Sequence, residues 1–273
     1  MLESQFESQV ASALDVRTSP ASPALPPGAL VVTGAGRGIG AEIARQGAGA
    51  GRPVVLVYRS GAQAAAAVVA QIEQAGGRAI SVGADVGCES EMERVFAAAD
   101  DEFGGVCGLV NNAVYAGTPT ALAQLSMAEL DAVLRTNVRG AFLCSQLAAR
   151  RMSTDAAGAG GGIVSMSSAV AVKTGAPGSW VHFAASKAAL ETMSLGLARE
   201  LASVGVRVNV VRCGLIDTES RLAQPQDYRR RLLDQVPLQR YGTPSEVAQA
   251  VLWLLSDQAA YVTGATLDVA GGL

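Results

Sequence analysis

Short apolar segments alternate with longer amphipathic segments along most of this chain. Apolar runs with the length and composition of strands occur at Ala29–Thr33, Pro53–Tyr58, Ala79–Val82, Gly108–Val110, Gly162–Met166, Val206–Val211 and Thr266–Val269. Segments typical of helices lie between them, at Gly38–Ala48, Ala62–Ala75, Glu89–Glu102, Met127–Arg151, Val181–Ser203 and Ser245–Ser256. This alternation predicts a single α/β domain, built as a doubly wound, seven-stranded parallel sheet with helices on both faces.

The N-terminal segment departs from this alternation. Over residues 2–14, apolar side chains recur at intervals of four, a weak pattern for an amphipathic helix. Residues 18–27 are rich in proline and serine, which is typical of an extended linker. We therefore predict a tail and linker over residues 1–27 and one folded domain over residues 28–273. The tail is either a frayed end or a helix that docks on a second subunit.

Composition and charge argue against several kinds of partner. Hydrophobic residues make up 49% of the 273 positions and aromatic residues only 4%, as suits the aliphatic core of a covered parallel sheet. The net charge of −3 gives no basic excess for nucleic acid or for an anionic membrane. Four scattered cysteines and a single histidine predict no metal site and no disulfide framework. The chain has no apolar run of membrane-spanning length and no signal peptide pattern, so we expect a cytoplasmic protein.

A glycine-rich turn follows the first predicted strand. Residues Thr33–Gly40 (TGAGRGIG) lead directly into a predicted helix. Glycines in such a turn let the backbone approach a pyrophosphate, and the helix N-terminus adds unpaired N–H groups and a positive dipole end. The spacing Gly-x-x-x-Gly-x-Gly, in this strand-turn-helix context, resembles the cofactor-binding fingerprint of the short-chain dehydrogenase/reductase family.

The end of the second predicted strand bears on the choice of cofactor. An acidic residue there would bind the 2′-hydroxyl of the adenosine ribose and repel a 2′-phosphate. This chain has Tyr58-Arg59-Ser60 instead, and Arg37 lies in the glycine turn. Two guanidinium groups suit a phosphate, so we predict NADPH rather than NADH. The alternative is that Arg59 is only a solvated surface residue.

Further motifs of the same family follow along the chain. Asp85-Val86 resembles the pair that reads the adenine, and Asn111–Ala113 resembles Asn-Asn-Ala-Gly, with Val114 in place of the glycine. Cys213–Thr218 resembles Pro-Gly-x-x-x-Thr, with cysteine in place of the proline. The resemblance covers the whole predicted domain and implies a Rossmann fold. It assigns to the cofactor Gly34, Gly36, Arg37, Gly38, Ile39, Gly40, Arg59, Ser60, Asp85, Val86, Asn112, Ala113, Lys187, Gly214, Ile216 and Thr218.

The resemblance also implies a catalytic set. In the family, a tyrosine donates the substrate proton and a lysine one helical turn later lowers the pKa of that tyrosine and binds the nicotinamide ribose. A serine holds the substrate oxygen, and an asparagine supports a chain of waters. Lys187 and Asn137 match two of these positions. Ser168 matches the serine, with its neighbour Ser167 as an alternative.

Phe183 occupies the position of the family's tyrosine. The ring has no hydroxyl, and the loss of a general acid lowers a rate by about 10²–10⁴-fold. One explanation is that the chain is an inactivated variant of an active reductase. Another is a natural family member with a different acid, such as Tyr115 or, less suitably placed on its helix, His182. The third is a fold repurposed for ligand binding or for chemistry other than redox.

The remaining predictions concern substrate and assembly. The resemblance implies carbonyl/alcohol interconversion on a small organic substrate, and it is strongest to the 3-oxoacyl reductase and glucose dehydrogenase branch. The segment Leu215–Leu238 is the predicted substrate loop. Its arginines form either a solvated helix face or a site for an acidic substrate or carrier. Members of that branch form tetramers, so we expect a homo-oligomer, tetramer or dimer, that pairs through the helices Met127–Arg151 and Val181–Ser203.

Overall fold

One parallel sheet organises the part of the chain that this computed structural model describes, residues 27–174, 178–219 and 226–273. Its strands are β1 (Ala29–Thr33), β2 (Val54–Tyr58), β3 (Ala79–Gly83), β4 (Val106–Asn111), β5 (Gly161–Ser168), β6 (Val206–Cys213) and β7 (Thr266–Val269). They are hydrogen-bonded in the order β3-β2-β1-β4-β5-β6-β7, and every pairing is parallel. The predicted seven-stranded parallel sheet is confirmed.

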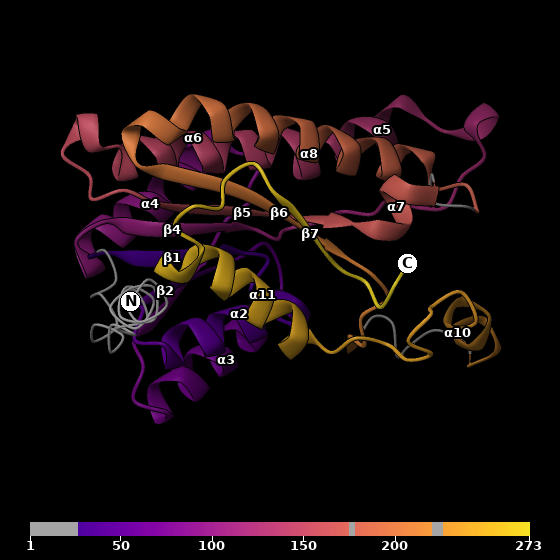
Figure 1. Cartoon of the computed structure of the whole chain (residues 1–273), viewed down its shortest axis with the longest axis horizontal. Coiled ribbons are helices and arrows are strands. Elements are labelled where there is room, and N and C mark those ends of the chain that lie inside the picture. The colour runs from indigo at the N-terminus through magenta and orange to yellow at the C-terminus, as the bar shows by residue number, and fades with distance from the viewer. Residues whose placement is uncertain (1–26, 175–177, 220–225) are drawn as a thin grey trace, which may run out of the picture.

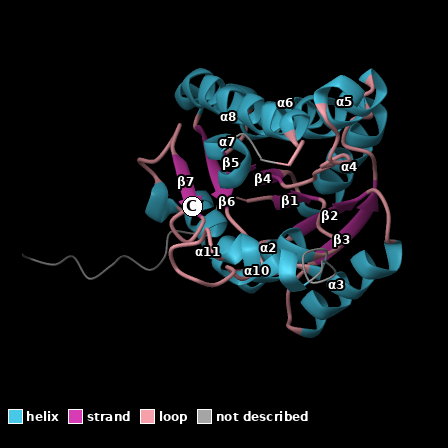
Figure 2. Ribbon diagram, turned by 90° about the vertical axis from the view of Figure 1, so that its right-hand side faces the viewer, coloured by secondary structure: helices cyan, strands magenta, loops and turns pink. Residues whose placement is uncertain are grey.

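Helices cover the two faces of the sheet, as Figures 1 and 2 show. One face carries α2 (Gly38–Gly49), α3 (Ala62–Gln74) and α11 (Pro244–Leu255), and the other carries α4 (Glu89–Phe103), α5 (Met127–Leu134), α6 (Gly140–Met152) and α8 (Val181–Leu201). Each face has its own aliphatic core, because the central strands bury side chains on both sides. Short 3₁₀ turns occur at Leu122–Gln124, Thr154–Ala156, Ala202–Val204 and Asp257–Ala259. None of the helices in the described ranges is both long enough and apolar enough to span a bilayer.

The strand order reverses between β1 and β4. From β1 the chain winds outward through β2 and β3, and from β4 it winds the other way through β5, β6 and β7. The connections that leave the carboxyl ends of β1 and β4 therefore diverge and leave a crevice at that edge of the sheet. The glycine turn follows β1 and Asn112 follows β4, so both predicted motifs lie at this crevice.

The structure corrects the prediction of one continuous helix over 127–151. A π-helical segment, Arg135–Arg139, separates α5 from α6. Inside it, the Asn137 side chain accepts a hydrogen bond from the Tyr115 N–H (2.8 Å) and donates to the Ser186 hydroxyl (2.9 Å). These partners belong to other segments of the chain, so the hydrophobic period of the helix carries no sign of the interruption.

Two short helices lie outside the predicted helical segments, although a helix face was one interpretation of the arginines in the predicted substrate loop. They are α7 (Ala169–Thr174), directly after β5, and α10 (Gln226–Leu233), within the predicted substrate loop. α7 spans only 6 residues and α10 only 8, too short for a helical period to stand out. The predicted tail helix and most of the predicted linker fall on residues 1–26, outside the described residues.

Candidate active site

The glycine turn is fastened to the neighbouring strand end by hydrogen bonds. The Thr33 hydroxyl donates to the Val110 carbonyl (3.1 Å) and accepts from the backbone N–H groups of Asn112 and Ala113 (3.0 Å each). The Asn112 side-chain amide donates to the carbonyls of Thr33 (2.8 Å) and Gly34 (3.1 Å). The turn after β1 and the loop after β4 are thus held together across the crevice.

Glycine is required in this turn for two reasons. Gly34 and Gly38 have φ values of +66° and +55°, which side chains rarely adopt. A Cβ at Gly40 would lie 2.5 Å from both the Asn112 amide nitrogen and the Gly34 carbonyl oxygen. A Cβ at Gly36 would meet nothing closer than 3.8 Å, because that backbone borders open space.

That open space is a cavity of about 570 Å³ in front of the α2 N-terminus. The predicted cofactor residues that line it are Gly34, Gly36, Arg37, Gly38, Ile39, Gly40, Arg59, Ser60, Asp85, Val86, Asn112, Ala113 and Thr218. Tyr58, Val114, Thr136 and Glu219 also line it, among others. The structure therefore brings together thirteen of the sixteen predicted cofactor residues in one cavity.

The two predicted phosphate-binding arginines lie at its rim. Arg37 is the N-cap residue of α2 and Arg59 follows β2, and both are exposed. Within the described residues, neither guanidinium takes part in a hydrogen bond or an ion pair. Both therefore keep their donors available to a ligand in the cavity.

Asp85, the predicted adenine contact, is held by its own neighbours. One carboxylate oxygen accepts from the Gly87 N–H (2.8 Å), and the other pairs with the Arg135 guanidinium (3.2 Å). A carboxylate has about four acceptor positions, so these two partners leave capacity for a ligand amine. Val86 is buried beside it, against Gly140.

A second cavity, of about 310 Å³, adjoins the first. It is lined by Ile39, Asn112, Val114, Met166, Ser167, Ser168, Phe183, Lys187, Cys213, Gly214, Ile216 and Thr218. Ile39, Asn112, Val114 and Thr218 line both cavities, so the two form one groove along the carboxyl edge of the sheet. The remaining predicted cofactor residues, Lys187, Gly214 and Ile216, lie in this smaller part.

Lys187 follows Phe183 by one turn of α8, and both side chains reach the smaller cavity. The Lys187 ammonium donates to the Met166 carbonyl (2.7 Å) and lies 5.9 Å from the centre of the Phe183 ring. Only 4% of Lys187 is exposed, and this burial lowers the pKa of its amine from 10.5 to about 8.

Burying this charge reduces the stability of the fold, and Lys187→Met tests by how much. A pKa shift from 10.5 to about 8 corresponds to about 3 kcal/mol, and loss of the hydrogen bond to Met166 offsets about 1 kcal/mol. We expect the variant to have a free energy of unfolding about 2 kcal/mol higher near pH 7. The folded-state pKa is the lower one, so the penalty is complete below about pH 8 and is lost as the pH rises toward 10.5.

Urea denaturation near neutral pH and again near pH 10 measures this difference. Lys173→Met is the matched control, because its ammonium is partly exposed and paired with Asp268. We expect the control to change stability by less than about 1 kcal/mol. A Lys187→Met variant less stable than the starting chain near pH 7 would contradict the burial argument.

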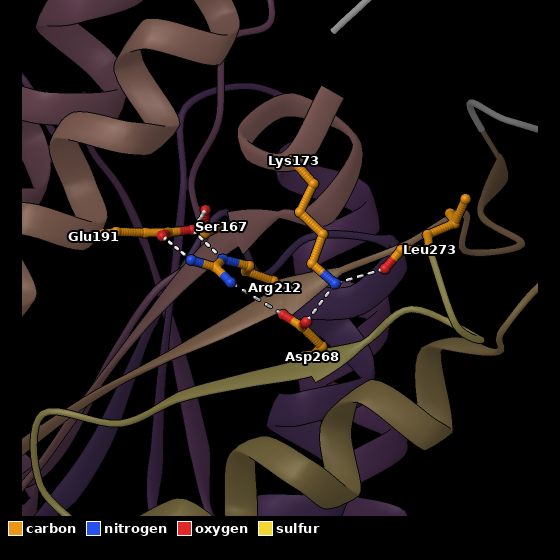
Figure 3. Close-up of polar contacts among 6 residues, drawn as sticks. All are labelled: Ser167, Lys173, Glu191, Arg212, Asp268 and Leu273. Carbon is orange, nitrogen blue, oxygen red and sulfur yellow. Dashed lines mark hydrogen bonds and ion pairs between the residues drawn. The ribbon is translucent and has the colours of Figure 1, made fainter. Parts of the chain in front are cut away.

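The contacts of the two candidate serines differ, as Figure 3 shows for Ser167. The Ser167 hydroxyl donates to Glu191 (2.6 Å), and Glu191 accepts two further hydrogen bonds from Arg212 (2.7 and 2.6 Å). Ser168 accepts from the Ala171 N–H (3.3 Å), which leaves its hydroxyl hydrogen available. This difference supports Ser168 as the substrate-binding serine, in agreement with the motif alignment.

The pair Glu191–Arg212 belongs to a longer ionic network that the sequence did not reveal. Arg212 also pairs with Asp268 (3.5 Å), Asp268 pairs with Lys173 (2.6 Å), and Lys173 donates to the Leu273 carbonyl (2.6 Å). The network, drawn in Figure 3, joins α7, α8, β6 and β7 and is bonded to Ser167 at the end of β5. Its members lie on separate elements, so no local pattern in the sequence indicates it.

Asn137 is the predicted catalytic residue that lines neither part of the groove. It is 2% exposed, and besides its bonds to Tyr115 N and Ser186 it donates to the Tyr115 carbonyl (2.9 Å). Its side chain thus fixes the loop after β4 against α8. The groove therefore brings together Ser168, Phe183 and Lys187. Asn137 lies outside its lining, hydrogen-bonded to Ser186 on α8.

Comparison with known proteins gives this groove a context. Residues 34–273 match the family model described as enoyl-(acyl carrier protein) reductase. The chain is 43% identical to an uncharacterized oxidoreductase, YgfF, of Escherichia coli, over 89% of this chain and 98% of that one. It is 36% identical to a 3-oxoacyl-[acyl-carrier-protein] reductase, FabG, of Staphylococcus epidermidis, over 89% of this chain and 97% of that one.

A solved structure agrees with the sequence matches. A short-chain dehydrogenase from Burkholderia cenocepacia, in complex with NADP, is 35% identical and superposes with a TM-score of 0.82, over 91% of this chain and 98% of that one. The chain belongs to the short-chain dehydrogenase/reductase family. The predicted family is thereby confirmed, and the chain is an oxidoreductase by family.

Apart from these comparisons, the structural features of the groove suit a dinucleotide. It contains the N-terminus of α2, where Gly34 and Gly38 have positive φ and the backbone of Gly36 borders open space. Within the described residues, the guanidinium groups of Arg37 and Arg59 on its lining are unpaired. Such a combination suits a pyrophosphate together with a further phosphate. At the other end of the groove, Lys187 and Ile216 line the smaller cavity.

Proposed function

We propose that this chain is an NADPH-dependent oxidoreductase that interconverts a small carbonyl compound and its alcohol, with slow proton transfer because of Phe183. The observation that carries the proposal is the continuity of the groove. Ser168, Phe183 and Lys187 line a cavity that shares four residues with the glycine-lined cavity at the α2 N-terminus. A cofactor lying along the groove would end beside these three side chains.

Each residue has a role that follows from its contacts. A bound NADPH would supply hydride to the carbonyl carbon. The Ser168 hydroxyl has its hydrogen available and donates it to the carbonyl oxygen, which polarises the bond. Lys187 is cationic near neutral pH and stabilises the negative charge that develops on that oxygen. The apolar side chains of Met166 and Phe183 limit the access of water.

Arg59 provides the test of cofactor choice. We expect Arg59→Asp to raise the Kd for NADPH about tenfold or more, because a charge-assisted hydrogen bond to the 2′-phosphate is lost. The Kd for NADH should stay the same or fall, since NADH lacks that phosphate and an aspartate at this position can accept a hydrogen bond from the 2′-hydroxyl of the adenosine ribose. Isothermal titration calorimetry with both cofactors measures the two values.

Arg94→Asp is the matched control for this test, because Arg94 is exposed on α4 and lines neither cavity. It makes the same change in net charge and should leave both Kd values unchanged within about threefold. Equal affinities of the starting chain for NADPH and NADH would refute the phosphate-clamp proposal. No binding of either cofactor would refute the proposed function itself.

We also propose that the chain forms a homo-oligomer through α5, α6 and α8. Large apolar side chains are exposed on these helices, including Phe142 (50%), Val181 (48%) and Leu195 (44%). Large apolar side chains exposed on neighbouring helices are suited to a protein interface. Multi-angle light scattering after gel filtration should give the mass of a dimer or a tetramer, and a mass equal to one chain would contradict the proposal.

The small-molecule substrate and the cytoplasmic location belong to the same proposal. All four cysteines are free, and Cys107, Cys144 and Cys213 are buried. Free thiols are typical of a reducing compartment. At its catalytic end the groove is a cavity of about 310 Å³, a size suited to a small organic carbonyl compound.

A further inference from the structure

The cavity beside Phe183 contains few groups that can release a proton. Among the described residues that line it, the titratable side chains are Lys187 and Cys213. Burial raises the pKa of the Cys213 thiol to about 12, so this thiol is a weak acid near neutral pH. Of the two, Lys187 is the group whose proton can be released in that range.

The two alternative donors named from the sequence lie outside this lining. The Tyr115 hydroxyl donates to the Glu129 carboxylate (3.2 Å), which raises the pKa of the phenol. His182 is 2% exposed, is stacked on Trp180, and faces Gly117, where a Cβ would lie 2.8 Å from its Nε2. Neither side chain lines the smaller or the larger part of the groove.

The position of the Lys187 ammonium suits a donor. It lies in the same lining as Ser168, which holds the substrate oxygen in the proposed reaction, and 5.9 Å from the centre of the Phe183 ring. A proton donor acts either in direct contact or through one water, and the cavity of about 310 Å³ that both side chains line can hold that water.

No neighbouring negative charge among the described residues stabilises the ammonium form of Lys187. No described carboxylate forms an ion pair with it, because Glu191, on the same helix, is bound to Ser167 and Arg212. From β5, the Met166 carbonyl accepts a hydrogen bond, and from β6 the facing titratable group is the Cys213 thiol. On the nearby α7, Lys173 is paired with Asp268. Burial therefore dominates and lowers the pKa of Lys187 to about 8, close to the pH at which a general acid is effective.

We propose that the ammonium group of Lys187 is the proton donor of this chain, in the role that a tyrosine hydroxyl fills elsewhere in the family. The inference rests on the proposed carbonyl reduction. The carbonyl carbon receives a hydride, with its electron pair, from NADPH, and the π pair of the C=O bond moves to oxygen. An N–H bond of Lys187 breaks, its proton passes to that oxygen, and its electron pair stays on nitrogen. The products are the alcohol and NADP⁺, and the neutral amine regains a proton from water.

The variant Lys187→Arg separates charge from proton donation. Arginine keeps the positive charge but does not deprotonate below about pH 12. We expect the Kd for NADPH to stay within about threefold, while kcat for NADPH oxidation with the probe ketones cyclohexanone and ethyl acetoacetate falls about 10²-fold. In the starting chain kcat should decline above about pH 8, where the amine loses its proton, and this decline should be absent from the variant.

A second readout does not depend on turnover. The chain has only two lysines, Lys173 and Lys187, so mass spectrometry can follow acylation of each amine separately as a function of pH. The labelling of Lys187 should have a midpoint near pH 8 that coincides with the decline in kcat. Lys173, which is partly exposed, is the internal control for the reagent. This readout keeps the inference testable if the arginine variant does not fold.

The outcomes distinguish this inference from the proposed function. Tyr115→Phe should leave kcat and its pH profile unchanged, since that hydroxyl lies outside the groove. The inference is overturned if Lys187→Arg retains the kcat and pH profile of the starting chain, or if the labelling and kcat midpoints differ. It is also overturned if the starting chain binds NADPH but shows no turnover above that of Lys187→Met. If the starting chain does not bind NADPH, the proposed function itself is refuted.

Discussion

Phe183→Tyr should raise kcat for NADPH-dependent ketone reduction by about 10²–10⁴-fold. The substitution adds one hydroxyl to a ring that already lines the cavity, one helical turn before Lys187. The lysine charge would lower the pKa of the new phenol, as a nearby cation does for any acid. The measurement is the initial rate of NADPH oxidation with a panel of simple ketones, at saturating cofactor and over a range of pH.

The control for this prediction is Phe103→Tyr, the same change at the end of α4, outside both cavities. It should leave kcat unchanged. If Phe183→Tyr increases no carbonyl reduction while the variant still binds NADPH, the chain is a repurposed family member that binds its ligand without redox chemistry. A large increase indicates instead that a single missing oxygen limits an otherwise complete site.

Gly40→Ala should weaken both the fold and cofactor binding. The new methyl group would lie 2.5 Å from the Asn112 amide nitrogen and from the Gly34 carbonyl oxygen, two groups that are hydrogen-bonded to each other. Neither can retreat without breaking the junction between β1 and β4. We expect the free energy of unfolding to fall by about 1–3 kcal/mol, and the Kd for NADPH to rise more than about tenfold.

Gly49→Ala is the matched control on the same helix. A Cβ at Gly49 would meet nothing within 4 Å. Alanine favours a helix over glycine by about 0.5–1 kcal/mol, so this variant should be equal to or more stable than the starting chain. Chemical denaturation and calorimetric titration of both variants provide the comparison. Equal stability of Gly40→Ala and Gly49→Ala would show that the turn relaxes around a methyl group.

The sequence predicts the groove well where local pattern and geometry coincide. The glycine turn has its spacing because the backbone itself contacts the cavity, and Phe183 and Lys187 share a helix face because they are four residues apart. Parallel strands place their carboxyl ends at one edge, which gathers Asp85, Asn112 and Thr218 there.

Features that depend on distant partners were not predictable in this way. Inside the π-helical segment, Asn137 contacts Tyr115 and Ser186, residues 22 and 49 positions away. Arg212 lies within a β-strand, where a charged side chain suggests exposure, yet it pairs with Glu191 on α8. No single segment of sequence contains both partners of such a contact, so only the fold reveals it.

The fluorescence of Trp180 can report on the site, because this side chain contacts Phe183. The chain contains two tryptophans, and Trp180 lies edge-on to Phe183 with ring centres 6.4 Å apart. The other, Trp253, is on α11, across the sheet from α8. Replacing Trp253 with phenylalanine would leave a single tryptophan, next to residue 183. Its emission would then report ligand entry and side-chain rearrangement in real time, even when no chemistry takes place.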